Sequence, residues 1–214
     1  MKGSQRVSKA IHFEKPDRVP YIGYNSYYPL VSDVLPLFPL TPTSWQPPPG
    51  KYPHVHPMQL QFHLYKWKPM GFKVNPPRCW KKWKNTPHQE IDEWGVIWEE
   101  VGDGTMGWPV DGPLKSWEDL DNLKIPDGSD PARYSLSRKI NKLVPKSWKY
   151  RLGLIDNFLF ERTHFLRGWN RYMHDLVRNP QKIRELIKII LPYYEKMIRQ
   201  LHEMGAQCVF TTDD

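Results

Sequence analysis

The chain has 214 residues, of which 39% are hydrophobic and 22 are proline, and it carries a net charge of +8 at pH 7. This length allows one large domain or two small ones, and the apolar content excludes a chain that is disordered throughout. No apolar run approaches the roughly 20 residues of a membrane-spanning helix. Two cysteines, Cys79 and Cys208, are too few for a disulfide framework. We therefore expect a cytoplasmic protein without a membrane partner.

The charge is unevenly distributed along the chain. Residues 1–85 and 133–214 are basic, whereas residues 86–132 are strongly acidic. No zinc finger, helix-turn-helix or RNA-recognition motif accompanies the basic segments. The run at 81–84, which combines three lysines with a tryptophan, is typical of a solvated loop. We expect no nucleic-acid partner.

The first half of the chain shows little regular pattern. One apolar face on residues 4–13 predicts a short helix, and residues 19–24 predict a short buried strand. Prolines are frequent after this strand, and residues 86–112 have the pattern of antiparallel β structure around Gly95. We interpret residues 25–130 as an irregular, partly β insertion.

The second half alternates strands with helices. Its clearest element is a helix at 180–204, whose apolar residues recur with helical periodicity. Two shorter helical segments, 158–167 and 169–177, precede it, and predicted strands at 150–155 and 207–212 flank all three. A strand, a helical crossover and a second strand form a βαβ unit, so the sequence predicts an α/β fold with a parallel sheet.

Polar residues at the ends of these strands are the first candidates for a functional site, because ligands of parallel α/β folds bind at the carboxyl ends of the strands. The candidates are Asn25, Tyr27, Asp156, Asn157, Asp213 and Asp214. The first four follow the strands at 19–24 and 150–155, and we expect them to bind substrate. The adjacent aspartates follow the last strand and are expected to be catalytic, since two carboxylates there can orient a base, hold a metal or position an amine. The alternative is that one of them caps a helix or turn.

Arg167 lies on the predicted helix after Asp156 and is a candidate for binding substrate. A guanidinium can bind a carboxylate or phosphate through two parallel hydrogen bonds. The alternative is a pair with a neighbouring acid such as Glu161 or Asp175. No metal ligand is assigned, because the histidines of the proline-rich stretch have no acidic or cysteine partner at a typical spacing. No P-loop, G-x-G-x-x-G or G-x-S-x-G motif supports nucleotide binding or serine hydrolysis.

Short segments spread in order over nearly the whole chain carry a further indication. They are Arg6-Val7 to Ala10-Ile11, Glu14 to Pro20, Asp92 to Val96, Gly112 to Leu114, Trp117 to Leu120, Phe160 to Arg162, Leu166 to Gly168, Asp175-Leu176, Asn179-Pro180 and Gly205-Ala206 leading to Asp213-Asp214. Together they resemble the uroporphyrinogen decarboxylase family, which includes the decarboxylases and many members similar to cobamide-dependent methyltransferases. The resemblance implies a (β/α)8 TIM barrel, and it places His164 where the decarboxylases carry a helical tyrosine, as a third catalytic candidate.

The resemblance leaves the reaction open between two classes. Decarboxylases carry an R-Q-A-G-R-Y stretch after the first strand for the propionates of the substrate, whereas residues 23–28 here contain no arginine. The methyltransferase-like members are therefore the better match. In those members His and Cys residues in the second half of the barrel bind zinc, which activates a thiol for attack on a methyl–corrinoid species. The expected partners are a small-molecule, tetrapyrrole or corrinoid substrate and a corrinoid protein.

The length bears on how much of such a barrel is present. A (β/α)8 barrel needs roughly 250 residues, and this chain shows about four barrel strands. We expect the N-terminal portion of the barrel over residues 1–214, truncated at its C-terminus and inactive alone, with zinc and a corrinoid as cofactors of the full-length enzyme only. An inactive remnant is a third interpretation.

Overall fold

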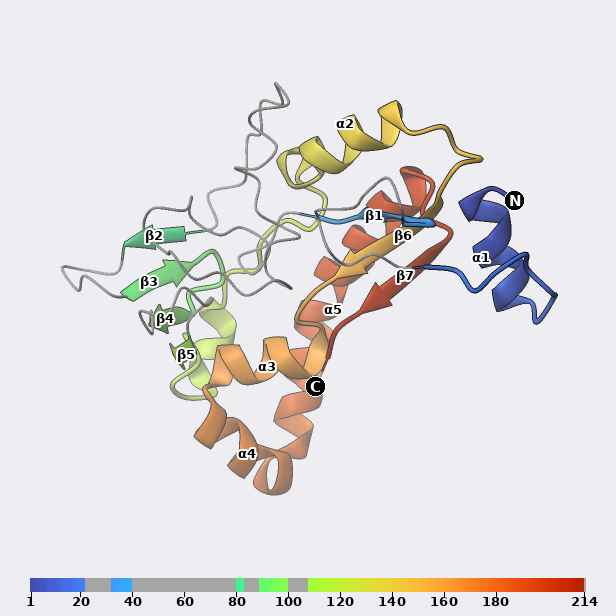
Figure 1. Cartoon of the computed structure of the whole chain (residues 1–214). Helices are drawn as coiled ribbons and strands as arrows, with labels where there is room; N and C mark the ends of the chain where they lie inside the picture. The colour runs from blue at the N-terminus through green and yellow to red at the C-terminus, as the bar shows by residue number, and fades with distance from the viewer. Residues whose placement is uncertain (22–31, 40–79, 83–88, 100–107, 214) are drawn as a thin grey trace.

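The computed structural model describes residues 1–21, 32–39, 80–82, 89–99 and 108–213 (Figure 1). Its α-helices are α1 (Gly3–Ile11), α2 (Ser135–Leu143), α3 (Leu159–Arg167), α4 (Trp169–Arg178) and α5 (Pro180–Glu203). Its strands are β1 (Val34–Leu37), β2 (Trp80–Lys82), β3 (Gln89–Asp92), β4 (Ile97–Glu99), β5 (Trp108–Asp111), β6 (Tyr150–Ile155) and β7 (Cys208–Thr211). Two 3-10 helices, η3 (Glu118–Asn122) and η4 (Pro131–Tyr134), lie between β5 and α2.

A parallel sheet with the strand order β1-β6-β7 positions the rest of the fold. Leu37 of β1 lies opposite Gly153 of β6, and Ile155 of β6 lies opposite Thr211 of β7. The middle strand β6 is buried along almost its whole length, as is usual where a parallel sheet is covered by other elements. The prediction of an α/β fold with a parallel sheet is confirmed. Within the described residues this sheet is open and does not close into a barrel.

The first strand of the sheet is not the one that the sequence predicts. Residues 19–21 form no strand, and residues 22–24 lie outside the described part of the chain. The strand paired with β6 is β1, inside the stretch interpreted as an insertion. The sequence V-L-P-L contains a proline, which has no N–H to donate to a neighbouring strand and marks a sheet edge. Because of this proline, the segment shows neither the alternating nor the continuous apolar pattern that predicts a strand.

α5 is the crossover between β6 and β7 and confirms the helix prediction at 180–204. Figure 1 shows it behind the parallel sheet, and its buried side chains are Ile183, Leu186, Ile190, Tyr193, Tyr194, Met197 and Leu201. The periodicity of these residues is that of a helix with one face in the core. Gly153 of β6 permits the close contact, because a Cβ atom there would lie only 3.0 Å from Leu201 Cδ1.

A second, antiparallel sheet with the order β2-β3-β4-β5 confirms the β prediction at 86–112 for the described strands. Asp92 at the end of β3 organises the turn into β4. Its carboxylate accepts the N–H groups of Trp94 and Val96, each at 2.9 Å, and the indole N–H of Trp98 at 3.0 Å. The guanidinium of Arg162 on α3 lies 3.8 Å from the same carboxylate, so this turn is fixed against α3.

α1 lies at the amino ends of the parallel strands (Figure 1), and Arg6 on this helix bonds to Asp33, the residue before β1. Arg6 is 7% exposed and donates to both carboxylate oxygens of Asp17, at 2.6 and 2.8 Å, and to Asp33 Oδ1 at 2.5 Å. Arg18 pairs with Asp33 Oδ2 at 3.0 Å, and the N–H of Tyr21 donates to that oxygen at 2.9 Å. Asp33 therefore joins α1 and the segment after it to the start of β1.

We expect Asp33→Asn to lower the urea midpoint of unfolding at neutral pH. Burial opposes ionisation of Asp33, but the Tyr21 N–H and the guanidinium groups of Arg6 and Arg18 hold its pKa below the ordinary value of 3.8. A carboxyl whose pKa is lower in the folded state stabilises the fold above 3.8, and this stabilisation is lost as the pH falls through the lowered folded value.

Urea titrations between about pH 2 and pH 7 test this expectation. The midpoint of Asp33→Asn should depend less on pH in the acidic range than that of the unmodified chain. Asp121→Asn, at an exposed position of η3, is the matched control. Equal midpoints for Asp33→Asn and the control at pH 7 would contradict this role of Asp33.

Candidate functional site

The carboxyl ends of β6 and β7 meet at one edge of the sheet, as the sequence predicts. The N–H of Thr212 donates to the carbonyl of Ile155 at 3.1 Å, and the N–H of Phe158 donates to the carbonyl of Thr212 at 3.0 Å. These bonds continue the pairing of the strands into the segments that follow them. Asp156 and Asp213, the first acidic residues after the two strands, are thereby brought to the same edge.

Asp156 is the group at this edge best suited to transfer a proton. Its side chain is partly buried and, within the described residues, makes no hydrogen bond or ion pair. Burial raises the pKa of Asp156 to about 6, because desolvation disfavours the charged form. A carboxyl that titrates near neutral pH can both accept and release a proton under working conditions. This residue was predicted to bind substrate, and the structure adds the capacity for acid–base chemistry.

The turn that carries Asp156 is fixed from two sides through Asn157. This residue is 5% exposed and has a φ of 52°, a left-handed conformation that is unusual outside glycine. Its N–H donates to Thr212 Oγ1 at 3.2 Å. The hydroxyl of Tyr194 on α5 donates to the carbonyl of Asn157 at 2.5 Å and lies 3.2 Å from the carbonyl of Phe158. Substrate binding by Asn157 stays a prediction, while its backbone shapes the edge.

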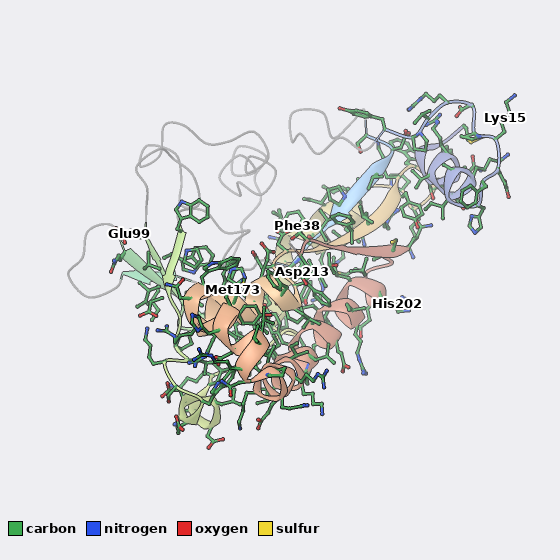
Figure 2. All side chains as sticks on the ribbon, turned by 90° about the horizontal axis from the view of Figure 1, so that it is seen from below. Lys15, Phe38, Glu99, Met173, His202 and Asp213 are labelled. Carbon is green, nitrogen blue, oxygen red and sulfur yellow. The ribbon has the colours of Figure 1, made fainter. Side chains whose placement is uncertain are left out.

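Asp213 caps helix α3. Its carboxylate accepts the N–H groups of Phe160 at 3.0 Å and Glu161 at 2.9 Å, two donors that have no partner inside the helix. Phe158, the residue that precedes α3, contributes no side-chain bond of its own. The alternative considered for the aspartate pair, a cap, is thus observed for Asp213, and its catalytic role stays a prediction. Figure 2 shows Asp213 in the middle of the molecule, far from Lys15 on the α1 side.

Arg167 is engaged inside the protein at the other end of α3. Its Nε donates to Asp175 at 2.7 Å, and its Nη1 donates to the carbonyls of Leu114 at 2.8 Å and Lys115 at 2.7 Å. The guanidinium also lies 4.7 Å from the ring centre of Trp117. Pairing with Asp175, the alternative considered from the sequence, is observed. These contacts connect α3, α4 and the segment after β5, and binding of a substrate by Arg167 is untested.

His164 projects into an aromatic cluster between α3 and α4. Its ring centre lies 4.4 Å from that of Phe165, 5.1 Å from Trp169 and 5.5 Å from Phe160, all in edge-on arrangements. Such packing stabilises the helix pair and leaves the predicted catalytic role without direct support. Asn25, Tyr27 and Asp214, the remaining candidates, lie outside the described residues.

Two residues that fix the turn after β6, Tyr194 and Thr212, were not among the candidates predicted from the sequence. Tyr194 belongs to the apolar stripe of α5 and is indistinguishable there from its neighbour Tyr193. Thr212 follows a strand, where a threonine is an ordinary residue and does not mark a function. A signal would have been available only from the register of β6 and β7, which brings Thr212 beside Asn157.

A cavity of about 570 Å³ lies elsewhere, lined by residues 91–95, Pro113 and residues of and after η3. Its carboxylates are occupied. Asp92 accepts three N–H groups, Glu93 pairs with Arg133 at 2.5 Å, and Asp119 accepts the N–H of Ser116 at 2.7 Å. Burial raises the pKa of Asp92 as well, but its carboxylate is already engaged by these three N–H groups.

No protein-family model matches the chain, and no curated protein matches it. Among the described residues, no cluster of three or more His, Cys, Asp or Glu side chains is arranged to hold a metal ion. Within the same residues, every helix is too short or too polar to cross a membrane.

We expect Arg167→Leu to destabilise the fold by about 3 kcal/mol or more, because it leaves the carboxylate of Asp175 buried without its cation. The side chains of this pair are 9% and 7% exposed. The control, Arg171→Leu, breaks a pair with Asp111 in which both side chains are 37% exposed and should cost less than about 1 kcal/mol. Urea unfolding measures both. A cost for Arg167→Leu no greater than that of the control would refute a structural role for the Arg167–Asp175 pair.

Asp213→Ala is expected to destabilise the protein by about 1 kcal/mol, the usual cost of losing a helix cap. Asp213→Asn retains an oxygen that can accept the same N–H groups and should cost only a fraction of this amount. Thermal unfolding of the two variants gives the comparison. If both variants unfold like the unmodified chain, Asp213 does not stabilise α3.

Proposed function

We propose that this chain is part of a methyltransferase-like enzyme of the uroporphyrinogen decarboxylase family, with its site at the carboxyl edge of β1, β6 and β7. The parallel sheet would then be the N-terminal portion of a (β/α)8 barrel. The observation that carries the proposal is Asp156, a carboxyl with a pKa raised to about 6 at the strand end where such folds bind ligands. The expected location is the cytoplasm, and the expected partners are a corrinoid substrate or protein.

The segments that carry the family resemblance support the proposal by touching one another. Arg6 pairs with Asp17 within the first two segments. Gly112, in the segment after β5, packs so tightly on α3 that a Cβ atom there would collide with the carbonyls of Phe165 and Leu166. Segments that carry the resemblance thus contact one another in the fold.

Asp156 would act as the proton acceptor of the reaction. Methyl transfer from a methyl–corrinoid to a thiol forms a carbon–sulfur bond and breaks the methyl–cobalt bond, whose electron pair stays on the corrinoid cobalt. The sulfur–hydrogen bond of the thiol breaks as well, so its proton must be taken up by a base. The ionised carboxylate of Asp156 takes that proton on one of its oxygens and later releases it to water. Since a base must be ionised, activity is present above the pKa of about 6 and is lost as the pH falls through it.

Zinc, which the family resemblance implies for thiol activation, does not fit the described residues. Among the described residues of the edge, the carboxylate of Asp156 has no partner, Asp213 is bonded to α3, and His164 is packed among aromatic rings. A zinc site needs three or four N, S or O ligands at about 2 Å. No step of the proposal is therefore assigned to a metal.

Decarboxylation of a uroporphyrinogen is the second candidate, and one observation favours it. A carboxylic acid with a pKa of about 6 can donate a proton to the carbon from which carbon dioxide leaves. The propionates of such a substrate require guanidinium groups, however. Arg162 is 2% exposed and lies beside Asp92, and Arg167 is occupied by Asp175, so neither is offered to a ligand. Methyl transfer thus stays the first candidate.

The test is methyl transfer from methylcobalamin to 2-mercaptoethanol by the enzyme of which this chain is the proposed N-terminal portion, with and without added zinc. We expect Asp156→Asn to lower kcat/KM by about 100-fold or more, the usual contribution of a general base. Asp127→Asn, which removes an exposed carboxylate paired with Lys196, is the matched control and should leave kcat/KM unchanged.

Each outcome decides between the candidates. Methyl transfer that does not depend on Asp156 would contradict its role as the base. Turnover of a uroporphyrinogen without metal or corrinoid would establish the decarboxylase instead. A folded enzyme containing this chain that shows neither activity would refute both candidates and favour the inactive remnant.

A further inference from the structure

The turn after β6 has a feature that the proposed reaction does not use. Asn157 is buried and left-handed, with a φ of 52°, although it carries a Cβ atom. For residues other than glycine this conformation costs free energy, and it persists only where surrounding contacts impose it. The contacts that stabilise this conformation of Asn157 come from residues outside the turn. They therefore also position the neighbouring Asp156.

One contact comes from α5. The hydroxyl of Tyr194 donates to the carbonyl of Asn157 at 2.5 Å and lies 3.2 Å from the carbonyl of Phe158. Tyr194 is 1% exposed, and its ring packs edge-on against Phe158 with ring centres 4.8 Å apart. A buried carbonyl without a donor is costly, so this hydroxyl stabilises the turn in the conformation observed.

The other contacts come from the end of β7. Thr212 Oγ1 accepts the N–H of Asn157 at 3.2 Å, and the carbonyl of Thr212 accepts the N–H of Phe158 at 3.0 Å. The N–H and carbonyl groups of the two residues after Asp156 are thus bonded to two parts of the chain that are both distant in sequence. The turn is fixed on both sides while the side chain of Asp156 has no partner among the described residues.

We propose that Tyr194 is a positioning residue, which holds the 156–158 turn in its left-handed conformation and so keeps the carboxyl of Asp156 in its partly buried place at the edge of the sheet. The inference rests on the proposed function, in which Asp156 exchanges the proton. Tyr194 itself contacts no reacting atom of the proposed methyl transfer. It acts through the backbone of Asn157 and Phe158.

The charged groups around Tyr194 do not supply the effect by themselves. Burial raises the pKa of Tyr194 to about 12, so its hydroxyl is protonated and donates at every working pH. Arg162 and Glu161 face it from α3, and Asp213 faces it from the segment after β7. Arg162 also makes a side-chain hydrogen bond with Tyr194, whose hydroxyl donates to the carbonyl of Asn157. Removal of the hydroxyl takes away the bond to the turn and leaves the charges of these three groups in place.

Tyr194→Phe tests the inference in the full chain, with Tyr193→Phe as the matched control. Both changes remove one buried hydroxyl from adjacent positions of α5, but only the first removes the bond to the turn. The first measurement is the titration of Asp156 by NMR of carboxyl-labelled aspartate. The second is hydrogen exchange of the Asn157 and Phe158 amides.

In Tyr194→Phe we expect the pKa of Asp156 to fall from about 6 by about one pH unit, a tenfold larger acid dissociation constant, because the relaxed turn hydrates the carboxyl. The amides of Asn157 and Phe158 should exchange at least about tenfold faster. The acid limb of the pH–rate profile should move to lower pH by the same amount as the pKa. Tyr193→Phe should change none of the three.

An unchanged pKa and unchanged amide exchange in a folded Tyr194→Phe would overturn the inference. If that variant does not fold, Thr212→Val removes the other side-chain contact to Asn157 and must then produce the same shift in the pKa of Asp156. The two proposals fail separately. Loss of the Tyr194 effect leaves the dependence of methyl transfer on Asp156 intact, whereas activity without Asp156 refutes the base but not the control of the turn by Tyr194.

Discussion

The buried guanidinium of Arg162 is the contact on which the arrangement of the two sheets depends. Its Nη1 lies 3.8 Å from Asp92, and its charge lies 4.9 Å from the ring centre of Trp94. A buried cation needs an anion and polarisable rings close by, because removal of either leaves its charge uncompensated. Asp92 also accepts the N–H groups that shape the turn between β3 and β4. The antiparallel sheet is therefore fixed against α3 by charge as well as by packing.

α3 transmits this constraint to the parallel sheet, since both of its ends are bound to distant parts of the chain. Asp213, after β7, accepts the N–H groups at its start. Arg167, in its last turn, donates to the carbonyl of Leu114 and to Asp175 of α4. A helix in contact on several sides needs no single apolar face, which explains the arginines among its buried residues. The edge of the sheet and the antiparallel sheet are thus parts of one structure.

The distribution of roles among the polar residues follows from this arrangement. Arg167 and Asp213 are functional candidates in the sequence, yet each has partners within the fold. Asp156 differs from them, because the backbone groups after it are bonded while its carboxyl has no partner among the described residues. A partly buried carboxyl of this kind has a raised pKa, which is typical of groups that exchange protons.

The sequence by itself determined the α/β class, the long helix at 180–204 and the two strands that flank it, because helical periodicity and apolar runs are local properties of a chain. It also placed Asp156 and Asp213 at the ends of those strands. The sequence could not show that the segment V-L-P-L forms strand β1. A proline there is compatible with a strand only at the edge of a sheet, and the place of a strand in the sheet is a tertiary property.

Only the tertiary structure decided which of the polar candidates are free to act. Asp213 and Arg167 bond to groups that lie some 50 residues away, Phe160 and Leu114 among them, and no local pattern encodes such partners. The same holds for Tyr194, whose hydroxyl reaches Asn157 across 37 positions. Burial and contacts with residues distant in the sequence set the proton affinity of a carboxyl. The sequence therefore predicts Asp156 as a candidate, but the packing around its turn raises its pKa to about 6.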